Sequence, residues 1–376
     1  MPGLKGLLRL ATFPAMRNRA PEVLRFAAAI AFSFAVPQFA ASQPAPPVPL
    51  TFGYAPSAPL PAFYVGQSIN AFESQGLKLK VENMADTTFL LDMLQSRQID
   101  MAGGATATVV QRRALGVPVK VIAAFGYSFT DKAGRSWEGV HLISPKTRNI
   151  TKMADLKGKR VAIVSFGSTW DIALRQRLRD AQVDPKDVTI LAMPFTQMAA
   201  ALLSGQIDAA AITVAEYARV NRSTPVNILM SASELTGVKI DVTQFVVARD
   251  DWLEKNQETA VRFLKALLQA HQWMVTDIEK NNGVKVKQVI KEKLGYDDFL
   301  TDATYEFRVG LESRLSSLVN PYDVPRSTID SYNRILVDGG LLRGKPAVKY
   351  EDLVDNRYLR RAYKELGMTW DETKAD

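Results

Sequence analysis

Residues 94–102 read LQSRQIDMA and residues 202–210 read LLSGQIDAA, so one short segment occurs twice in this chain. The two segments share six of nine residues at a spacing of 108. Farther along, VPVKVIAAF at 117–125 lies opposite TPVNILM at 224–230 at nearly the same spacing. A repeat with so long a period predicts two paired copies of one fold unit rather than a solenoid.

Short apolar stretches alternate with helical ones around each repeated segment, which predicts an α/β fold with a largely parallel sheet in each copy. Ligands of open α/β sheets bind outside the carboxyl ends of the strands, so the loops after the strands are the expected site. The predicted strands are 50–54, 77–83 and 99–104 in the first copy and 160–166, 187–193 and 207–212 in the second. The predicted helices are 63–74, 87–95, 169–181 and 196–203.

Two β-rich segments, 139–144 and 242–252, are expected to carry the chain between the copies, and helices are predicted beyond them at 260–274 and 326–336. The predicted organisation is therefore two α/β lobes with a cleft between them. The first lobe takes residues 48–140, the second takes 141–244, and residues 245–376 return to the first lobe with C-terminal helices.

The composition excludes several classes of functional site. The chain has 376 residues, 47% of them hydrophobic, with no cysteine and only two histidines. Disulfides, thiolate metal sites and cysteine nucleophiles are excluded, and we expect no metal and no cofactor. The formal charge is +8, but the bases are interspersed with acids, so we predict solvated faces and no nucleic-acid binding.

The N-terminus has the pattern of a secretory signal peptide. Five bases and one acid are followed by the 11-residue apolar run FAAAIAFSFAV at 26–36, whereas a membrane-spanning helix needs roughly 20 residues. Small residues follow at 40–42, so we predict a signal peptide over 1–42 and a periplasmic mature protein. Its removal lowers the formal charge from +8 to +4.

Residues 155–162 read DLKGKRVA and 165–169 read SFGST. With the paired Gln-Ile-Asp segments, these strings resemble the periplasmic substrate-binding proteins of ABC importers, in the aliphatic-sulfonate, taurine and nitrate group. The resemblance covers about 50–275. It implies a two-lobed periplasmic binding protein fold of type II-like form, a monomer that is not an enzyme, a small anionic organic ligand, and ABC permease membrane subunits as partners.

Site residues are predicted on both lobes. Ser168, Thr169 and Trp170 stand where a strand turns into a helix, whose N-terminus is a natural anion site. Their hydroxyls could equally be plain helix caps. In the first lobe, Tyr54 and Ser57 belong to the turn after the first strand, which could also be a rigid turn without ligand contact.

The third strand of each copy ends in a second group of candidates. Gly104, Ala105 and Thr106 follow it in the first lobe, where small residues allow backbone donors to approach a ligand or helices to pack. Thr213 and Glu216 hold the duplicated place in the second lobe. Glu216 could bind a ligand ammonium, or it could be an acid favoured by the helix dipole.

Two other functions compete with solute binding. Pyrimidine-precursor synthases of thiamine pathways share the fold and resemble the chain, but they use a cysteine-rich segment. An enzyme here would have Glu216 with His141 as its only nominated pair, and a ligand sensor domain is the other alternative. The solute itself stays open between a sulfonate, a taurine-like zwitterion, a nitrate-like ion and an aromatic carboxylate.

Overall fold

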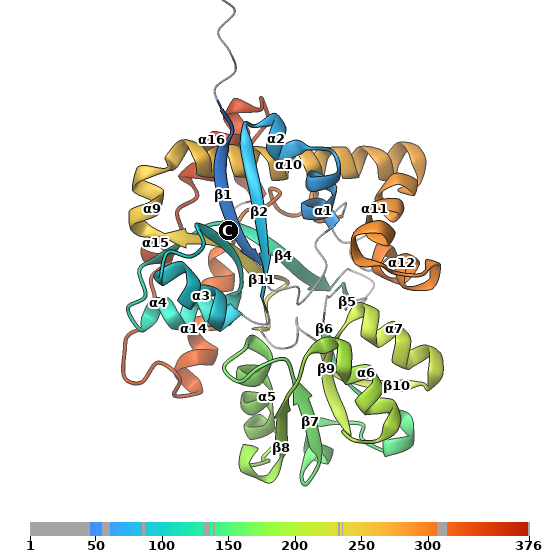
Figure 1. Cartoon of the computed structure of the whole chain (residues 1–376). Coiled ribbons are helices and arrows are strands. Elements are labelled where there is room, and N and C mark those ends of the chain that lie inside the picture. Colours follow the sequence, from blue (N-terminus) through green and yellow to red (C-terminus); the bar gives the residue numbers. More distant parts are fainter. Residues whose placement is uncertain are drawn as a thin grey trace, which may run out of the picture. The chain divides into compact units, whose positions relative to one another are not determined.

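The computed structural model describes residues 46–54, 61–84, 87–130, 136–137, 140–231, 234, 236–306 and 314–374. The signal peptide predicted over 1–42 lies outside these residues. The described chain is built around two sheets, with strand orders β2-β1-β3-β11-β4-β5 and β10-β6-β9-β7-β8 (Figure 1). We call the elements around the first sheet the first lobe and those around the second sheet the second lobe.

The strands of the first sheet are β1 (Val48–Tyr54), β2 (Leu77–Asn83), β3 (Met101–Ala105), β4 (Val119–Thr130), β5 (Ser136–Trp137) and β11 (Ile240–Arg249). Those of the second are β6 (Val140–Pro145), β7 (Arg160–Ile163), β8 (Thr189–Ala192), β9 (Ala209–Thr213) and β10 (Val226–Ser231). The helices up to residue 223 are α1 (Pro61–Ser68), α2 (Ala71–Ser74), α3 (Thr87–Gln95), α4 (Thr106–Ala114), α5 (Thr169–Asp180), α6 (Phe195–Ser204) and α7 (Val214–Ser223). Those after residue 249 are α9 (Asp250–Lys255), α10 (Gln257–Asn281), α11 (Val284–Leu294), α12 (Asp298–Thr304), α14 (Arg326–Asp338), α15 (Tyr350–Leu353) and α16 (Arg357–Glu365).

The two sheets repeat one topology. In the first, β2, β1 and β3 are parallel, and β11 runs antiparallel between β3 and β4. In the second, β8, β7 and β9 are parallel, and β6 runs antiparallel between β9 and β10. The predicted duplication is confirmed. The prediction of largely parallel sheets is confirmed in strand direction, because among the described strands only β11 and β5 run against the others in the first sheet and only β6 does so in the second. Both sheets are mixed, because β6 and β11 enter from the edge at which the parallel strands end and therefore run back.

The two segments expected to cross between the lobes do not do so. Residues 140–145 form β6, whose partners are β9 and β10 in the second sheet. Residues 240–249 form β11, whose partners are β3 and β4 in the first sheet. Each segment is thus a strand of one sheet, and the chain changes lobes before it. The lobe boundaries at 140 and 244 stay a prediction.

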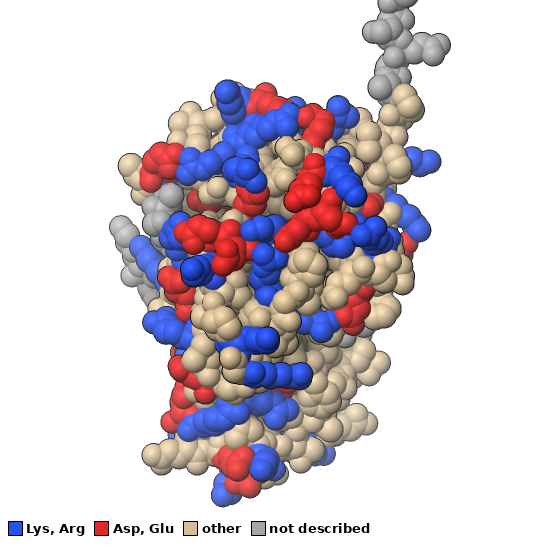
Figure 2. All heavy atoms as spheres, turned by 90° about the vertical axis from the view of Figure 1, so that its left-hand side faces the viewer, with Lys and Arg blue, Asp and Glu red and all other residues tan. Residues whose placement is uncertain are grey.

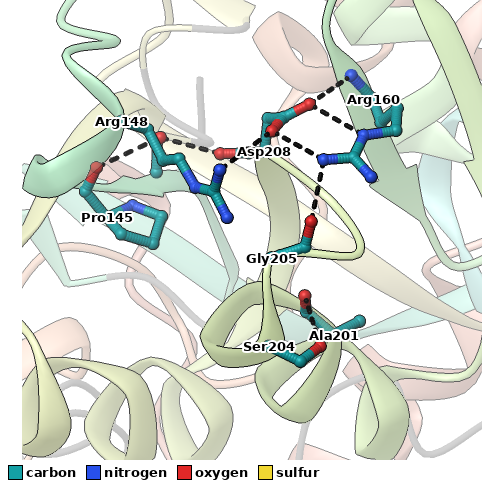
Figure 3. A network of polar contacts seen from close by, with 8 residues as sticks. Pro145, Arg148, Arg160, Ala201, Ser204, Gly205 and Asp208 are labelled. Carbon is teal, nitrogen blue, oxygen red and sulfur yellow. Dashed lines mark hydrogen bonds and ion pairs between the residues drawn. The ribbon is translucent and has the colours of Figure 1, made fainter.

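The repeated aspartate has a structural role in both copies. Asp208 Oδ2 accepts hydrogen bonds from the Arg160 backbone N–H at 2.9 Å and from its Nε at 3.1 Å, and Oδ1 accepts from Nη2 at 3.0 Å (Figure 3). In the first copy, Asp100 Oδ2 accepts from the Thr51 backbone N–H at 2.8 Å. In both copies the aspartate N–H also donates to the carbonyl of the same strand residue. The side chain therefore extends the pairing between neighbouring strands, which accounts for the conserved spacing within this chain.

The helix predicted over 63–74 is interrupted. α1 ends at Ser68 and α2 begins at Ala71, because Asn70 between them adopts a left-handed backbone with φ of 55°. Asparagine tolerates this conformation better than most residues, and it breaks the helical hydrogen-bond ladder. The helices predicted at 260–274 and 326–336 lie within α10 and α14.

Three apolar clusters form the main core. Two of them cover the faces of the first sheet, with α10 and α16 on one face and α3, α4 and α14 on the other. The third cluster is formed where α5 and α6 pack against the second sheet. Ile172 of α5 belongs to a first-lobe cluster, so this helix packs on both lobes. The core thus fixes α5 beside the first lobe.

Charged side chains of both signs are intermixed over much of the face shown in Figure 2. In the described part of the chain, ion pairs such as Arg113 with Asp250 at 3.0 Å and Lys157 with Asp187 at 3.1 Å join charges of opposite sign. Of the helices that the structure describes, none combines the length and apolar character needed to cross a membrane.

Candidate functional site

The predicted site residues lie where the parallel strands end and helices begin. α4 follows β3 directly, α7 follows β9 directly, and α5 follows β7 after the turn at 164–168. The free N–H groups of a first helical turn point away from the helix, so these three starts offer hydrogen-bond donors at the carboxyl edges of the sheets. Ser57 belongs to this group in the prediction but lies outside the described residues.

Ser168 is the N-cap of α5. Its Oγ accepts a hydrogen bond from the Asp171 N–H at 3.3 Å. The Asp171 carboxylate in turn accepts from the Gly167 N–H at 2.8 Å and from Arg175 Nε at 2.7 Å. The helix start therefore carries its own carboxylate, whose charge Arg175 balances. The capping role foreseen as the plain interpretation of Ser168 is present, and a ligand contact would be additional.

Thr169 is the first residue of α5, and its Oγ1 is buried without a hydrogen-bond partner in the described part of the chain. Buried hydroxyls in folded proteins are almost always hydrogen-bonded, so this atom calls for a water or a ligand. Trp170 is buried and belongs to the core cluster of the second lobe. Thr169 thus has a buried hydroxyl that makes no hydrogen bond to the described residues.

A hydrogen bond joins the two lobes at this edge. Thr108 Oγ1, in the first turn of α4, donates to the Gly167 carbonyl at 3.3 Å. Gly167 immediately precedes the start of α5 and has a positive φ of 76°, which glycine adopts without strain. The start of α4 on the first lobe and the start of α5 on the second lobe are therefore neighbours.

In the first lobe, α4 begins without a side-chain cap, because its N-cap is Ala105. Thr106 instead donates from Oγ1 to the Val242 carbonyl at 2.5 Å. A side chain added at Gly104 would place Cβ 3.0 Å from Val109 Cγ2 and 3.2 Å from Thr87 Cγ2. Gly104 therefore serves the close packing of α3 and α4, and the uncapped helix start provides the donors.

Tyr54 closes β1 and is fully buried. Its ring centroid lies 5.8 Å from that of Phe63 and 5.7 Å from that of Phe125, the latter edge-on. A Cβ at Gly103 would press into the Phe125 ring at 2.7 Å. These aromatic rings thus pack together at the end of β1, at the carboxyl edge of the first sheet.

Thr213 caps α7 as Ser168 caps α5, with Oγ1 accepting from the Glu216 N–H at 3.4 Å. The Glu216 carboxylate lies 3.7 Å from Arg219 Nε and lines a pocket of about 530 Å³ between α6, α7 and the start of α12. Burial raises the pKa of Glu216, although the charge of Arg219 works against the rise. The residues that line this pocket include none of the other described candidates.

Two polar residues at the first-lobe edge escaped the sequence reasoning. Thr87 accepts the Ala105 N–H on its Oγ1 at 2.9 Å and so couples α3 to the start of α4. Gln244 is buried in β11 and lies opposite Ala105 in the sheet register. In the sequence, Gln244 stands out as the single amide in the apolar run VTQFVV. Only the sheet register shows that it lies opposite Ala105.

Together these groups offer a set of hydrogen-bond donors at the carboxyl edges of the two sheets. Helix starts and hydroxyls can donate hydrogen bonds to an oxygen-rich group. Glu216 and His141, the pair nominated for an enzyme, have different neighbours. The His141 ring centroid lies 5.6 Å from that of Tyr217, whereas Glu216 pairs with Arg219.

Comparison with known proteins is consistent with this geometry. The "Putative binding protein YtlA" of Bacillus subtilis is 26% identical over 237 residues, which is 62% of this chain and 66% of that protein. The matched part is thus slightly under two thirds of the length of YtlA. The 4-amino-5-hydroxymethyl-2-methylpyrimidine phosphate synthase THI5 of Saccharomyces cerevisiae is 23% identical over 249 residues, covering 63% of this chain and 70% of the enzyme.

Among solved structures, the alkanesulfonate-binding protein SsuA of Xanthomonas axonopodis superposes with a TM-score of 0.63 at 18% identity, covering 83% of this chain and all of that one. The predicted periplasmic binding protein fold is thereby confirmed. The model of the family described as NMT1/THI5 like matches residues 60–280. Since that match takes in more than half of the chain, the protein belongs to the NMT1/THI5-like family.

Proposed function

We propose that this chain is an extracytoplasmic solute-binding protein, which holds a small anionic organic molecule between its lobes and delivers it to an ABC permease. The observation that carries the proposal is the meeting of α4 and α5 at the Thr108 to Gly167 hydrogen bond. Two helix starts from different lobes converge there, beside the unpartnered Thr169 hydroxyl. A solute bound to both starts would stabilise the closed arrangement of the lobes.

The proposed anion is supported by the donors available. Helix N-termini favour negative charge, and α4 has no side-chain cap of its own. Asp171 opposes an anion at α5, but its charge is already balanced by Arg175 at 2.7 Å. The SsuA likeness adds an alkanesulfonate as one solute to try first. Glu216 as the partner of a ligand ammonium stays a prediction, because its carboxylate opens into a different pocket.

A pyrimidine-precursor synthase is the competing function, and the THI5 match favours it. The absence of cysteine from the whole chain argues against it, because the resembling synthases use a cysteine-rich segment. Solute binding predicts that a bound molecule is recovered unchanged after incubation, whereas an enzyme would return a product. Mass spectrometry of the released molecule distinguishes the two.

The site is tested by substituting its hydroxyls. A thermal-shift screen with hexanesulfonate, taurine, nitrate and benzoate first identifies a solute that stabilises the protein. Calorimetry then compares Ser168→Ala and Thr169→Ala with the parent chain. Each loses a hydrogen bond to a charged group, about 1.5–3 kcal/mol, so we expect roughly ten- to hundredfold weaker binding.

Ser204→Ala is the matched control, because its hydroxyl donates to the Ala201 carbonyl in the last turn of α6, away from the helix starts. Its affinity should equal that of the parent. If Ser168→Ala and Thr169→Ala both keep full affinity and normal melting, the acidic group binds elsewhere and these hydroxyls act only as structural groups.

A further inference from the structure

A second contact joins the lobes away from the α4 and α5 starts. α7 of the second lobe packs against α12, which lies beside it in Figure 1. Ala215 and Ala218 of α7 and Leu300 of α12 are buried and form one small apolar cluster. Leu300 packs against these two small side chains, and only 4% of its surface is exposed.

α12 is attached to the first lobe through α11. Lys287 and Lys291 of α11 form ion pairs with Asp302 and Asp298 of α12 at 2.7 Å and 2.6 Å. α11 itself packs on α1 and α10, which cover the first sheet. The contact between α7 and α12 is therefore a contact between lobes, although α12 is remote from the helix starts in sequence.

Polar groups surround the apolar contact. The Arg222 guanidinium of α7 lies 4.7 Å from the ring centroid of Phe299 on α12, a distance suited to a cation–π interaction. Glu216 of α7 and Tyr296, just before α12, are close enough that the carboxylate adds to the rise in the pKa of Tyr296 that burial causes. The contact between the lobes therefore combines apolar packing with polar interactions, and both lobes contribute residues to it.

We infer that the α7–α12 contact is a latch that holds the lobes together and sets the ratio of open to closed molecules before any solute binds. A rotation that separates α7 from α12 has to expose Leu300 and break the Arg222 to Phe299 interaction. The closed form is then favoured by apolar burial outside the solute site. The inference builds on the proposed function, because the lobes must open to admit a solute, but its test uses none.

The expected effect follows from the buried leucine. Truncating Leu300 to alanine removes most of an apolar side chain that the closed form buries, which should raise the ratio of open to closed molecules roughly tenfold or more. Phe299→Ala removes the cation–π interaction and keeps Leu300, so a smaller change in the same direction is expected.

The measurement is a distance between the lobes in solute-free protein. Because the chain has no cysteine of its own, a spin label attaches only to cysteines that are introduced. We place them at two exposed positions, Glu73→Cys on α2 and Lys186→Cys on the second lobe. Pulsed electron resonance should show Leu300→Ala and Phe299→Ala shifted toward longer distances. Leu203→Ala is the control, because Leu203 lines the same pocket from α6 without joining the cluster.

An unchanged distance distribution in both α12 variants, or an equal change in the control, overturns the latch. If Leu300→Ala lowers the melting temperature so far that it cannot be measured, a cross-link decides. Ala218→Cys with Leu300→Cys, bridged by a short bifunctional maleimide, should reduce the radius of gyration by small-angle scattering to that of the closed form. A cross-linked protein that still samples the uncross-linked range means that α7 and α12 form a pivot and not a latch.

Discussion

The duplicated aspartate provides an internal comparison of two nearly equivalent sites. Asp100→Ala and Asp208→Ala each remove the acceptor of a partly buried backbone N–H, from Thr51 in one copy and Arg160 in the other. Leaving such a donor unsatisfied costs about 1–3 kcal/mol. Both variants should therefore lower the free energy of unfolding by that amount.

Asp208 has an additional partner. It also accepts hydrogen bonds from the Arg160 guanidinium, whose side chain is 42% exposed while that of Asp208 is 11% exposed. Because solvent screens a pair of this kind, the guanidinium should add only a small further stabilisation. Asp208→Ala is therefore expected to lower the free energy of unfolding somewhat more than Asp100→Ala.

Urea unfolding measures the difference, with the midpoint lowered and the slope unchanged in both variants. Burial works to raise the pKa of Asp208, but hydrogen bonds from Arg160 and the charges of Arg160 and Arg148 outweigh it and lower the pKa. The stabilisation by Asp208 is then complete above the ordinary aspartate pKa and is lost as pH falls through the lower pKa of the folded protein. Equal midpoints for parent and both variants would refute the strand-pairing explanation of the repeat.

Two further predictions concern charge and export. Burial raises the pKa of Glu216, so the folded state binds a proton there more tightly than the unfolded state does. The parent therefore loses stability as pH rises from the ordinary glutamate pKa to the raised one. Glu216→Gln lacks this loss and should gain stability relative to the parent as pH rises from the ordinary glutamate pKa to above the raised one, as measured by urea midpoints. A relative loss over the same range would contradict the assignment. The mature protein is expected to begin near residue 43 and to occur in the periplasmic fraction, which intact-mass measurement checks, and recovery of only the full 41.6 kDa chain would disprove export.

Much of the fold could be predicted because it depends on local patterns. The Gln-Ile-Asp segments recur since each copy needs a carboxylate that pairs with its neighbouring strand, and that need is local enough to leave a repeated string. The reversed directions of β6 and β11 could not be predicted in the same way. Whether β6 and β11 run parallel or antiparallel depends on the side from which the chain enters the sheet, and apolar runs of either direction look the same.

Within the candidate site, the sequence correctly marks where helices begin. Ser168 and Thr213 precede their helices as capping residues do, and the N-cap hydrogen bonds are present in both. Sequence spacing does not show which way a side chain on such a helix points. Glu216 stands one turn into α7, and only its packing against α12 places its carboxylate in a pocket of its own.

By itself, the sequence determined the duplication, the α/β class and the helix starts, because periodicity, capping and repeated short motifs depend on neighbours within one turn or one strand. Tertiary structure alone decided the meeting of Thr108 with Gly167 and of Leu300 with Ala215 and Ala218. Partners so far apart in the chain are selected by the packing of whole lobes, where many weak contacts act together. No residue in either contact has a local pattern that names its partner.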